Sequence, residues 1–260
     1  MQGTIWNFIA GGEYTGDFNM SFDEMLAQRL VSGLGAPTLR LYRWKPWAIS
    51  LGHNQNLSDI NIDRCRRDGI DVVRRPTGGR AILHAEELTY SVTMPVDRRG
   101  ILQVYNEIST ALVEGLRQFG VDVSLQRSQL NFVETYKSPS SIPCFSSSAR
   151  YEIEWKGKKL VGSAQRRYTG NGGEVVLQHG SILCGSSHRR LAEYLVTNEA
   201  VRQEIRRDLE NKTCDLVAIR HSSIDLNKLS ECIKRGFEIA WGVTFADVEI
   251  ETIQQKESYA

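Results

Sequence analysis

A cysteine and a lysine are the first candidates for chemistry in this sequence. Cys144 lies in the run SSIPCF, within residues 127–149, where serine and proline are frequent and hydrophobic periodicity is lost, so a long functional loop is expected. Lys159 follows beyond one expected strand and one turn, and could return beside that loop. A neighbouring cation lowers the pKa of a thiol and favours the nucleophilic thiolate. The pair therefore suggests covalent catalysis.

The five cysteines favour free thiols over disulfides or a zinc site. Their number is odd, and no two of them form a CxxC pair. A free cysteine is more often a small buried side chain than a nucleophile. Cys65 and Cys232, which lie on expected helices, fit that description. The histidines show no HxH or HExxH spacing, so no metal site is predicted.

The segment RRPTGGR, residues 74–80, is a candidate for ligand binding. Gly78 and Gly79 would let backbone N–H groups approach a ligand. The guanidinium groups of Arg75 and Arg80 suit carboxylate, phosphate or carbonyl oxygens. The segment is not a P-loop, which needs GxxxxGK[ST] at the start of a helix. A tight turn with surface arginines is the alternative explanation.

Two histidines and a run of small residues extend the candidate site. His84 follows the glycine loop, and His179 lies on an expected strand; each could instead be a hydrogen-bonded core residue. Gly162, Ser163 and Ala164 leave room for a ligand beside another expected strand.

Strand alternation makes a further prediction around the lysine. It would place Lys159 and Val161 on one face of their strand and Leu160 on the other. The preceding lysine, Lys158, is expected to be solvated.

Both strands and helices are expected to position these candidate residues. The expected strands are 4–9, 38–44, 48–52, 71–75, 87–94, 151–155, 158–166, 174–183 and 244–250, and the expected helices are 17–30, 58–68, 101–119, 191–209 and 226–241. Hairpin-length connections between strands, with helices interspersed, favour an α+β fold with a mainly antiparallel or mixed central sheet flanked by helices. A Rossmann fold is disfavoured.

Composition and charge narrow the class of protein. A chain of 260 residues, 41% of them hydrophobic, can bury one substantial core, and we expect a single domain over 1–260 with a helical C-terminal part at about 187–260. The net charge of +1 gives no general attraction to nucleic acid or membrane. The start, MQGTIWNFIAGG, does not resemble a secretory signal. A cytoplasmic protein with no nucleic-acid or membrane partner is expected.

Several separated motifs resemble, in order, the biotin/lipoate protein ligase and octanoyltransferase family. They are NMSFDE (19–24), LRLYRW (39–44), SLG (50–52), VRRPTGGRA (73–81), ELTYSV (87–92), KLVGSAQ (159–165) and QHGSI (178–182). The resemblance covers about residues 5–185 and is more specific than any single motif. It implies an α+β domain of the biotin/lipoate protein ligase kind, related to class II synthetases.

Within that family the chain resembles the octanoyltransferases of the LipM type. Lipoate ligases generally lack the cysteine and usually carry a third glycine where this chain has Arg80. The resemblance implies that Cys144 is the nucleophile and that Lys159 lowers its pKa. It also implies a set of substrate-binding residues: Arg75, Gly78, Gly79, Arg80, His84, Gly162, Ser163, Ala164 and His179.

The implied activity is the first step of lipoate biosynthesis. Octanoyl would pass from octanoyl-acyl carrier protein, through a thioester on Cys144, to a lysine of the glycine-cleavage H protein or another lipoyl domain, with no cofactor required. An ATP- and Mg²⁺-dependent lipoate-protein ligase and an octanoyl amidotransferase acting between lipoyl domains are the alternative enzymes. A catalytically silent binding module is the alternative from another class.

The acyl group would need both an apolar slot and donors for its carbonyl oxygen. Val73, Leu83 and Val161 are candidates for the slot wall, and Arg75 and His84 for its entrance. Backbone N–H groups around the two glycines of the loop, together with the lysine, would hold the carbonyl oxygen.

Overall fold

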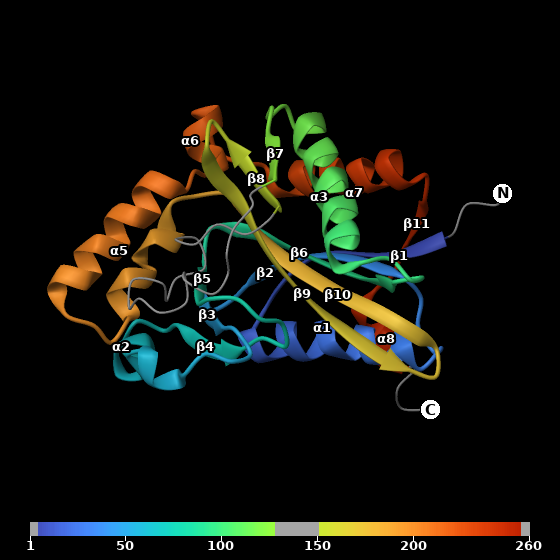
Figure 1. Ribbon diagram of the computed structural model, residues 1–260, viewed down its shortest axis with the longest axis horizontal. Helices are drawn as coiled ribbons and strands as arrows, with labels where there is room; N and C mark the ends of the chain where they lie inside the picture. Colours follow the sequence, from blue (N-terminus) through green and yellow to red (C-terminus); the bar gives the residue numbers. More distant parts are fainter. Residues whose placement is uncertain (1–4, 128–150, 256–260) are drawn as a thin grey trace.

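The computed structural model describes residues 5–127 and 151–255, and Cys144 lies outside the described residues. The strands are β1 (Ile5–Tyr14), β2 (Thr38–Trp44), β3 (Ala48–Leu51), β4 (Asp71–Arg74), β5 (Ile82–His84), β6 (Glu87–Pro95), β7 (Ser124–Arg127), β8 (Tyr151–Trp155), β9 (Lys158–Gly170), β10 (Gly173–Leu183) and β11 (Thr244–Asp247). A large sheet has the order β11-β1-β2-β6-β10-β9-β8-β7, and a small sheet has the order β4-β3-β5 (Figure 1).

Both sheets mix parallel and antiparallel pairs. In the large sheet β1 is parallel to its neighbours β2 and β11, and the other pairs are antiparallel. In the small sheet β3 is parallel to β4 and antiparallel to β5. The prediction of a mixed sheet in an α+β fold is therefore confirmed.

Helices cover both faces of the large sheet. They are α1 (Gly16–Val31), α2 (Ile62–Arg67), α3 (Ile101–Gln118), α5 (Glu199–Lys212), α6 (Leu216–Arg220), α7 (Leu226–Trp241) and α8 (Ile250–Gln255), with 3₁₀ turns η1 (Leu57–Asp59) and η4 (Ser187–Tyr194). Figure 1 shows α1 on one side of the sheet and α3 with α7 on the other. Every residue of β6 from Glu87 to Met94 is buried, as a strand covered on both faces requires.

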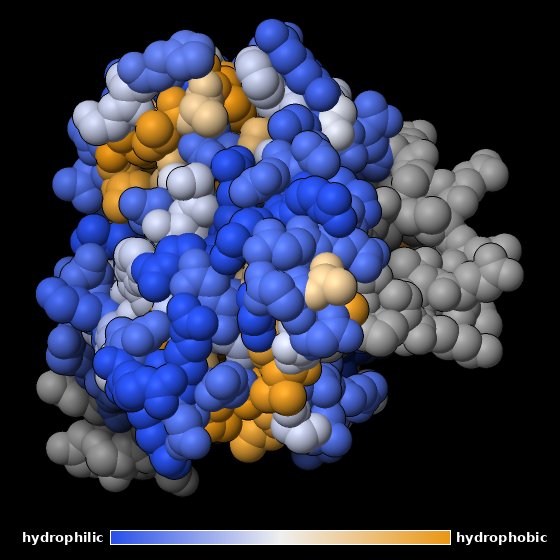
Figure 2. Space-filling model, turned by 90° about the vertical axis from the view of Figure 1, so that its left-hand side faces the viewer, coloured by the Kyte–Doolittle hydropathy of each residue, from blue (hydrophilic) through white to orange (hydrophobic). Residues whose placement is uncertain are grey.

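The helices α2 and α5 bury few of their residues. α5 buries only Ile205 and Leu209, and Figure 2 shows mainly hydrophilic residues at the end of the molecule where α2 and α5 lie. No helix in the described part of the chain is long and apolar enough to cross a bilayer.

Several predicted boundaries were wrong because contacts distant in sequence override local pattern. The helix expected over 58–68 is split into η1 and α2, since Ile60 forms an isolated bridge with Leu195. The helix expected over 191–209 is likewise a 3₁₀ turn followed by α5, which begins after the N-cap Asn198. The last strand ends at Asp247, before α8, and strands β5 and β7 were not predicted.

Two glycines let α3 and α7 approach to backbone contact. A Cβ atom on Gly236 of α7 would lie 2.3 Å from the backbone nitrogen of Gly115 and 2.5 Å from the carbonyl oxygen of Ala111, both on α3. A Cβ atom on Gly115 would lie 2.7 Å from the Cα atom of Ile233. Separations this short are repulsive, so any larger side chain would force the helices apart.

We expect the substitution Gly236→Ala to lower the free energy of unfolding by about 1–3 kcal/mol through overpacking. Alanine favours an isolated helix by about 1 kcal/mol, so a loss of stability would report the helix contact rather than propensity. Urea denaturation measures it. Gly100→Ala is the control, since nothing lies within 4 Å of its Cβ position and its φ is −67°. A stability equal to that of the control would contradict the close packing.

Candidate active site

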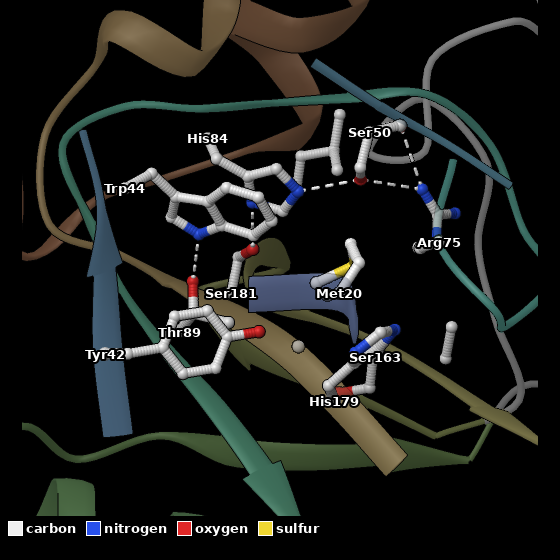
Figure 3. A pocket seen from close by; sticks show the side chains of 14 residues that line it. Met20, Tyr42, Trp44, Ser50, Arg75, His84, Thr89, Ser163, His179 and Ser181 are labelled. Atoms are coloured by element: carbon white, nitrogen blue, oxygen red, sulfur yellow. Dashed lines mark hydrogen bonds between the residues drawn. The ribbon is translucent and has the colours of Figure 1, made fainter. Parts of the chain in front are cut away.

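A cavity opens between α1 and both sheets, with a mainly apolar lining (Figure 3). Six of the predicted site residues line it: Arg75, His84, Gly162, Ser163, Ala164 and His179. The structure thus brings the glycine loop's arginine, both histidines and the run of small residues together around one space.

Some predicted residues do not line the cavity. Gly78, Gly79 and Arg80 lie in the loop that Arg75 holds, as described below. Two of the candidates for the slot wall missed the lining by one strand position. Leu83 and Val161 belong to the main core, whereas the adjacent Ile82 and Gly162 face the cavity. The third, Val73, packs in a small cluster with Met20, Tyr42, Trp44 and Ala48.

Arg75 is a buried residue that fastens the glycine loop. Its Nη1 atom donates to the carbonyl and hydroxyl oxygens of Ser50 at 3.0 and 3.1 Å. Its Nε and Nη2 atoms donate to the carbonyl of Gly78 at 3.1 and 2.9 Å, and Nη2 also donates to the carbonyl of Arg80 at 2.7 Å. With 5% of its surface exposed, Arg75 is not the surface arginine of the alternative explanation.

Geometry requires glycine at Gly79 in this loop and at Gly52 beside it. Gly79 has φ of +93°, in the left-handed region that favours glycine. A Cβ atom on Gly52 would lie 2.1 Å from the carbonyl oxygen of Gly79, so the loop presses on the end of β3. Arg74 donates to carbonyls of the same neighbourhood, those of Gly52, His53 and Gln55.

His84 is held between a serine and a carboxylate. Its Nδ1 lies 2.8 Å from Oε1 of Glu87, and its Nε2 lies 2.7 Å from Oγ of Ser50. The ring stacks on Trp44 with centroids 3.9 Å apart and planes 11° apart. The indole of Trp44 in turn donates to Thr89. Figure 3 shows His84, Trp44, Ser50 and Thr89 along one wall of the cavity.

His179 joins the cavity to a buried carboxylate. Its Nδ1 lies 3.2 Å from Oδ2 of Asp23, and its Nε2 lies 2.7 Å from the hydroxyl of Thr77 in the glycine loop. Burial lowers the pKa of His179 despite the opposing effect of Asp23. The neutral ring therefore donates from Nδ1 to the carboxylate and accepts the Thr77 hydroxyl at Nε2.

Asp23 is the centre of a buried polar cluster beneath the cavity. Its Oδ1 accepts from Arg40 at 2.8 Å, and its Oδ2 accepts from the hydroxyl of Tyr42 at 2.9 Å. Burial alone would raise the pKa of the Asp23 carboxyl, but Arg40 and His179 overcome this and hold the pKa below its ordinary value. Asp23 is thus a buried carboxylate that stays ionised at neutral pH.

Lys159 is buried in an ion pair outside the cavity lining. Its Nζ lies 2.6 Å from Oε1 of Glu152, and both side chains are 6% exposed. The pairing of β8 with β9 shifts here, because Ile153 pairs with Val161 but Glu154 pairs with Lys159. This β-bulge breaks the simple alternation predicted for Lys159 and Val161, and bulges commonly re-aim side chains beside active sites. The proximity of Lys159 to Cys144 stays a prediction.

The neighbouring Lys158 is held rather than freely solvated. Its Nζ donates to the carbonyl of Glu210 at 3.1 Å, and the residue is half-buried.

The four cysteines of the described residues are free thiols with raised pKa values. Burial raises the pKa of Cys65 and Cys214 to about 11 and that of Cys184 to about 12. Burial also raises the pKa of Cys232. None of these four thiols is therefore suited to act as a thiolate nucleophile at neutral pH.

No group of three metal-ligating side chains gathers within residues 5–127 and 151–255. The cavity residues instead offer imidazoles, hydroxyls and a guanidinium group that is already hydrogen-bonded. Such a lining suits an apolar ligand with a small polar head.

Comparison with known proteins places the chain in a family. The lipoyl protein ligase A/B catalytic domain family matches residues 15–238. This chain belongs to that family. Its relatives include octanoyltransferase LipM of Bacillus subtilis (strain 168), 33% identical over 96% of this chain and 91% of the relative. Octanoyltransferase LipM of Kyrpidia tusciae is 35% identical over 97% of this chain and 93% of the relative.

Solved structures support the lipoyl protein ligase fold. A lipoate-protein ligase A bound with ATP has a TM-score of 0.72 at 20% identity, covering 98% of this chain and 94% of that one. A lipoate protein ligase of T. acidophilum with bound lipoic acid has a TM-score of 0.71 at 20% identity, covering 95% and 90%. At this identity the likeness concerns the fold alone, and it confirms the lipoate-ligase-like architecture predicted from the motifs.

Proposed function

We propose that this protein is an octanoyltransferase of lipoate biosynthesis, acting through a thioester on Cys144. The observation that carries the proposal is the similarity along nearly the whole chain to relatives named octanoyltransferase LipM. The mainly apolar cavity supports it, because an acyl chain needs an apolar slot. The buried Lys159, on the same strand as the small residues that line the cavity, supports it because a thiolate needs a cation nearby.

In the first half-reaction the thiolate of Cys144 attacks the carbonyl carbon of octanoyl-acyl carrier protein. The bond from that carbon to the carrier's sulfur breaks, and the carrier leaves as a thiolate that takes a proton from solvent. A thioester replaces a thioester, so the exchange needs no ATP and no cofactor. The Lys159 ammonium lowers the pKa of the attacking thiol.

In the second half-reaction the ε-amine of an acceptor lysine attacks the enzyme thioester. The carbon–sulfur bond breaks, an amide forms, and the Cys144 thiolate is regenerated. The acceptor is a lipoyl-domain protein such as the glycine-cleavage H protein. Conversion of a thioester to an amide is downhill and completes the transfer.

The cavity would hold the octanoyl chain. Met20, Tyr42 and Trp44 supply apolar surface, and the small residues of β9 leave the space open. Each methylene buried from water contributes about 0.8 kcal/mol to binding, so the depth of the slot would set the preferred chain length.

Mass spectrometry of the intact protein tests the proposal directly. After mixing with octanoyl-acyl carrier protein, we expect one octanoyl group on the wild type and none on Cys144→Ser. Cys232→Ser is the matched control, because Cys232 is a partly exposed thiol of the described residues. This variant should still be acylated.

Two results would overturn the thioester route. One is the absence of an adduct on the wild type. The other is octanoylation of a lipoyl domain by Cys144→Ala when it is supplied with octanoate, ATP and Mg²⁺, which would identify an ATP-dependent ligase instead.

A further inference from the structure

One hydroxyl on the cavity wall has a hydrogen-bonding site left open. Ser50 lines the cavity, and its Oγ accepts from Nη1 of Arg75 at 3.1 Å. The same oxygen lies 2.7 Å from Nε2 of His84. A hydroxyl has one donor and two acceptor positions. Within the described residues, a proton donated to His84 and a bond accepted from Arg75 leave the second acceptor position of Ser50 unoccupied.

The contact with Glu87 determines which atoms donate in the hydrogen bonds from Ser50 to His84 and from His84 to Glu87. A carboxylate oxygen accepts, so the 2.8 Å contact with Oε1 of Glu87 places a ring proton of His84 on Nδ1. Nε2 is then the basic nitrogen and accepts the Ser50 hydroxyl. The same oxygen of Glu87 also accepts from Thr89 at 2.6 Å and from Ser181 at 2.8 Å, which fixes the carboxylate.

The surroundings hold the imidazole in place. Stacking on Trp44 prevents rotation of the ring. Glu87 has a side chain only 1% exposed, so its charge acts on His84 with little screening by water. A buried carboxylate hydrogen-bonded to one nitrogen both orients a histidine and stabilises the imidazolium formed when the other nitrogen takes a proton.

We propose that Ser50, His84 and Glu87 form a proton relay that deprotonates the acceptor lysine during the second half-reaction. This inference rests on the proposed function. As the amine nitrogen bonds to the acyl carbon and the carbon–sulfur bond breaks, one N–H proton passes to Ser50 Oγ. The Ser50 hydroxyl proton passes at the same time to Nε2 of His84. The products are the amide, the enzyme thiolate and an imidazolium paired with Glu87, which later loses its proton to solvent.

The same order of residues would also suit a serine nucleophile. Arg75 distinguishes the two roles, because its hydrogen bond withdraws charge from Ser50 Oγ and occupies one of the two lone pairs. A nucleophile needs a reactive oxygen that is free to form a covalent bond. A relay needs only one accepting position and one proton to give, and Ser50 has both.

The test compares two acceptors on the isolated octanoyl-enzyme. The nitrogen of lysine is strongly basic, so it keeps its surplus proton in the adduct until a base removes it. The weakly basic nitrogen of hydroxylamine loses that proton readily to water and depends far less on a base. In single-turnover experiments we expect Ser50→Ala to lower the ratio of the rate with a lipoyl-domain lysine to the rate with hydroxylamine by about 10²-fold or more. Glu87→Gln, in which the positioning carboxylate loses its charge, should lower the same ratio.

Ser91→Ala is the matched control, since Ser91 is a buried serine of β6 outside the cavity lining. It should keep the wild-type ratio.

The outcomes separate the relay from the proposed function. If Ser50→Ala and Glu87→Gln slow both acceptors equally, the residues are structural and the relay is wrong. An octanoyl ester found on Ser50 in the Cys144→Ser variant would replace the relay with a serine nucleophile. If the wild type forms no acyl-enzyme at all, it is the proposed function that fails.

Discussion

Replacing Lys159 by methionine should slow formation of the octanoyl-enzyme by about 10²–10³-fold, the usual effect of removing one donor that stabilises developing negative charge. The side chain is 6% exposed and its Nζ lies 2.6 Å from Oε1 of Glu152, which fixes its position. Loss of this cation also raises the pKa of the attacking thiol and reduces the thiolate present at neutral pH. Rapid-quench measurement of acylation by octanoyl-acyl carrier protein gives the rate.

Two further variants separate chemistry from folding. Lys159→Met leaves the Glu152 carboxylate buried without this cation, so part of any loss could reflect lower stability. The double variant Lys159→Met/Glu152→Gln removes that charge and should regain stability but not activity. Lys158→Met is the matched control, because it removes a lysine from the same strand whose Nζ donates to the Glu210 carbonyl. Acylation by Lys159→Met at the wild-type rate would contradict a catalytic role.

The bounds of elements with a strong hydrophobic pattern were predicted accurately from the sequence. α3 and α7 each bury one apolar stripe, and the expected ranges 101–119 and 226–241 differ from theirs by at most one residue. β2, with nearly every residue buried, matches 38–44. β5 was missed because three residues are too few to show a period. Such short strands form only because longer neighbours supply their partners.

The candidate site shows what sequence can and cannot supply. Motif residues such as Arg75 and His179 could be selected from the sequence because glycines, arginines and histidines are unusual in an apolar pattern, and both line the cavity. Met20 and Trp44 were missed because an apolar cavity wall has the same pattern as a core. The candidate Leu83 failed by one position, since a single residue's offset moves a strand side chain to the opposite face.

The polar cluster around Asp23 had a signal that was not used. Asp23 follows Phe22 on α1 and Arg40 lies between Leu39 and Leu41 on β2, and a charge at such a position is rarely buried unless it is paired. Searching each buried element for such a charge would have predicted the pair, although not its position under the cavity. The same search would have found Glu87 at the start of β6.

This cluster and the proposed relay approach the cavity from different sides. His179 connects Asp23 to Thr77 of the glycine loop, and His84 connects Glu87 to Ser50 beside Arg75. Each histidine has one ring nitrogen beside a buried carboxylate and the other beside a hydroxyl. The first arrangement fixes the loop, and the second presents a hydroxyl to the ligand, so one structural device serves both stability and chemistry.

The largest effect on stability should come from Asp23→Asn. The substitution leaves the Arg40 guanidinium buried without its carboxylate, and breaking a buried ion pair typically costs about 3–5 kcal/mol of unfolding free energy. Urea denaturation at pH 7 measures the loss. Asp63→Asn is the matched control, because the Asp63–Arg66 pair is 81% and 78% exposed and should contribute far less.

The dependence of stability on pH provides a second test of the Asp23 charge. Arg40 and His179 hold the pKa of Asp23 below its ordinary value in the folded protein, against the effect of burial. An unfolded aspartate has a pKa of about 3.9, so below that pH the unfolded chain binds this proton more readily than the folded one. The ion pair's contribution is therefore complete above about pH 4 and is lost as the pH falls through the folded-state pKa. The difference in stability between wild type and Asp23→Asn should shrink as the pH falls below about 4, and a difference that stays constant would mean that Asp23 is not ionised in the folded protein.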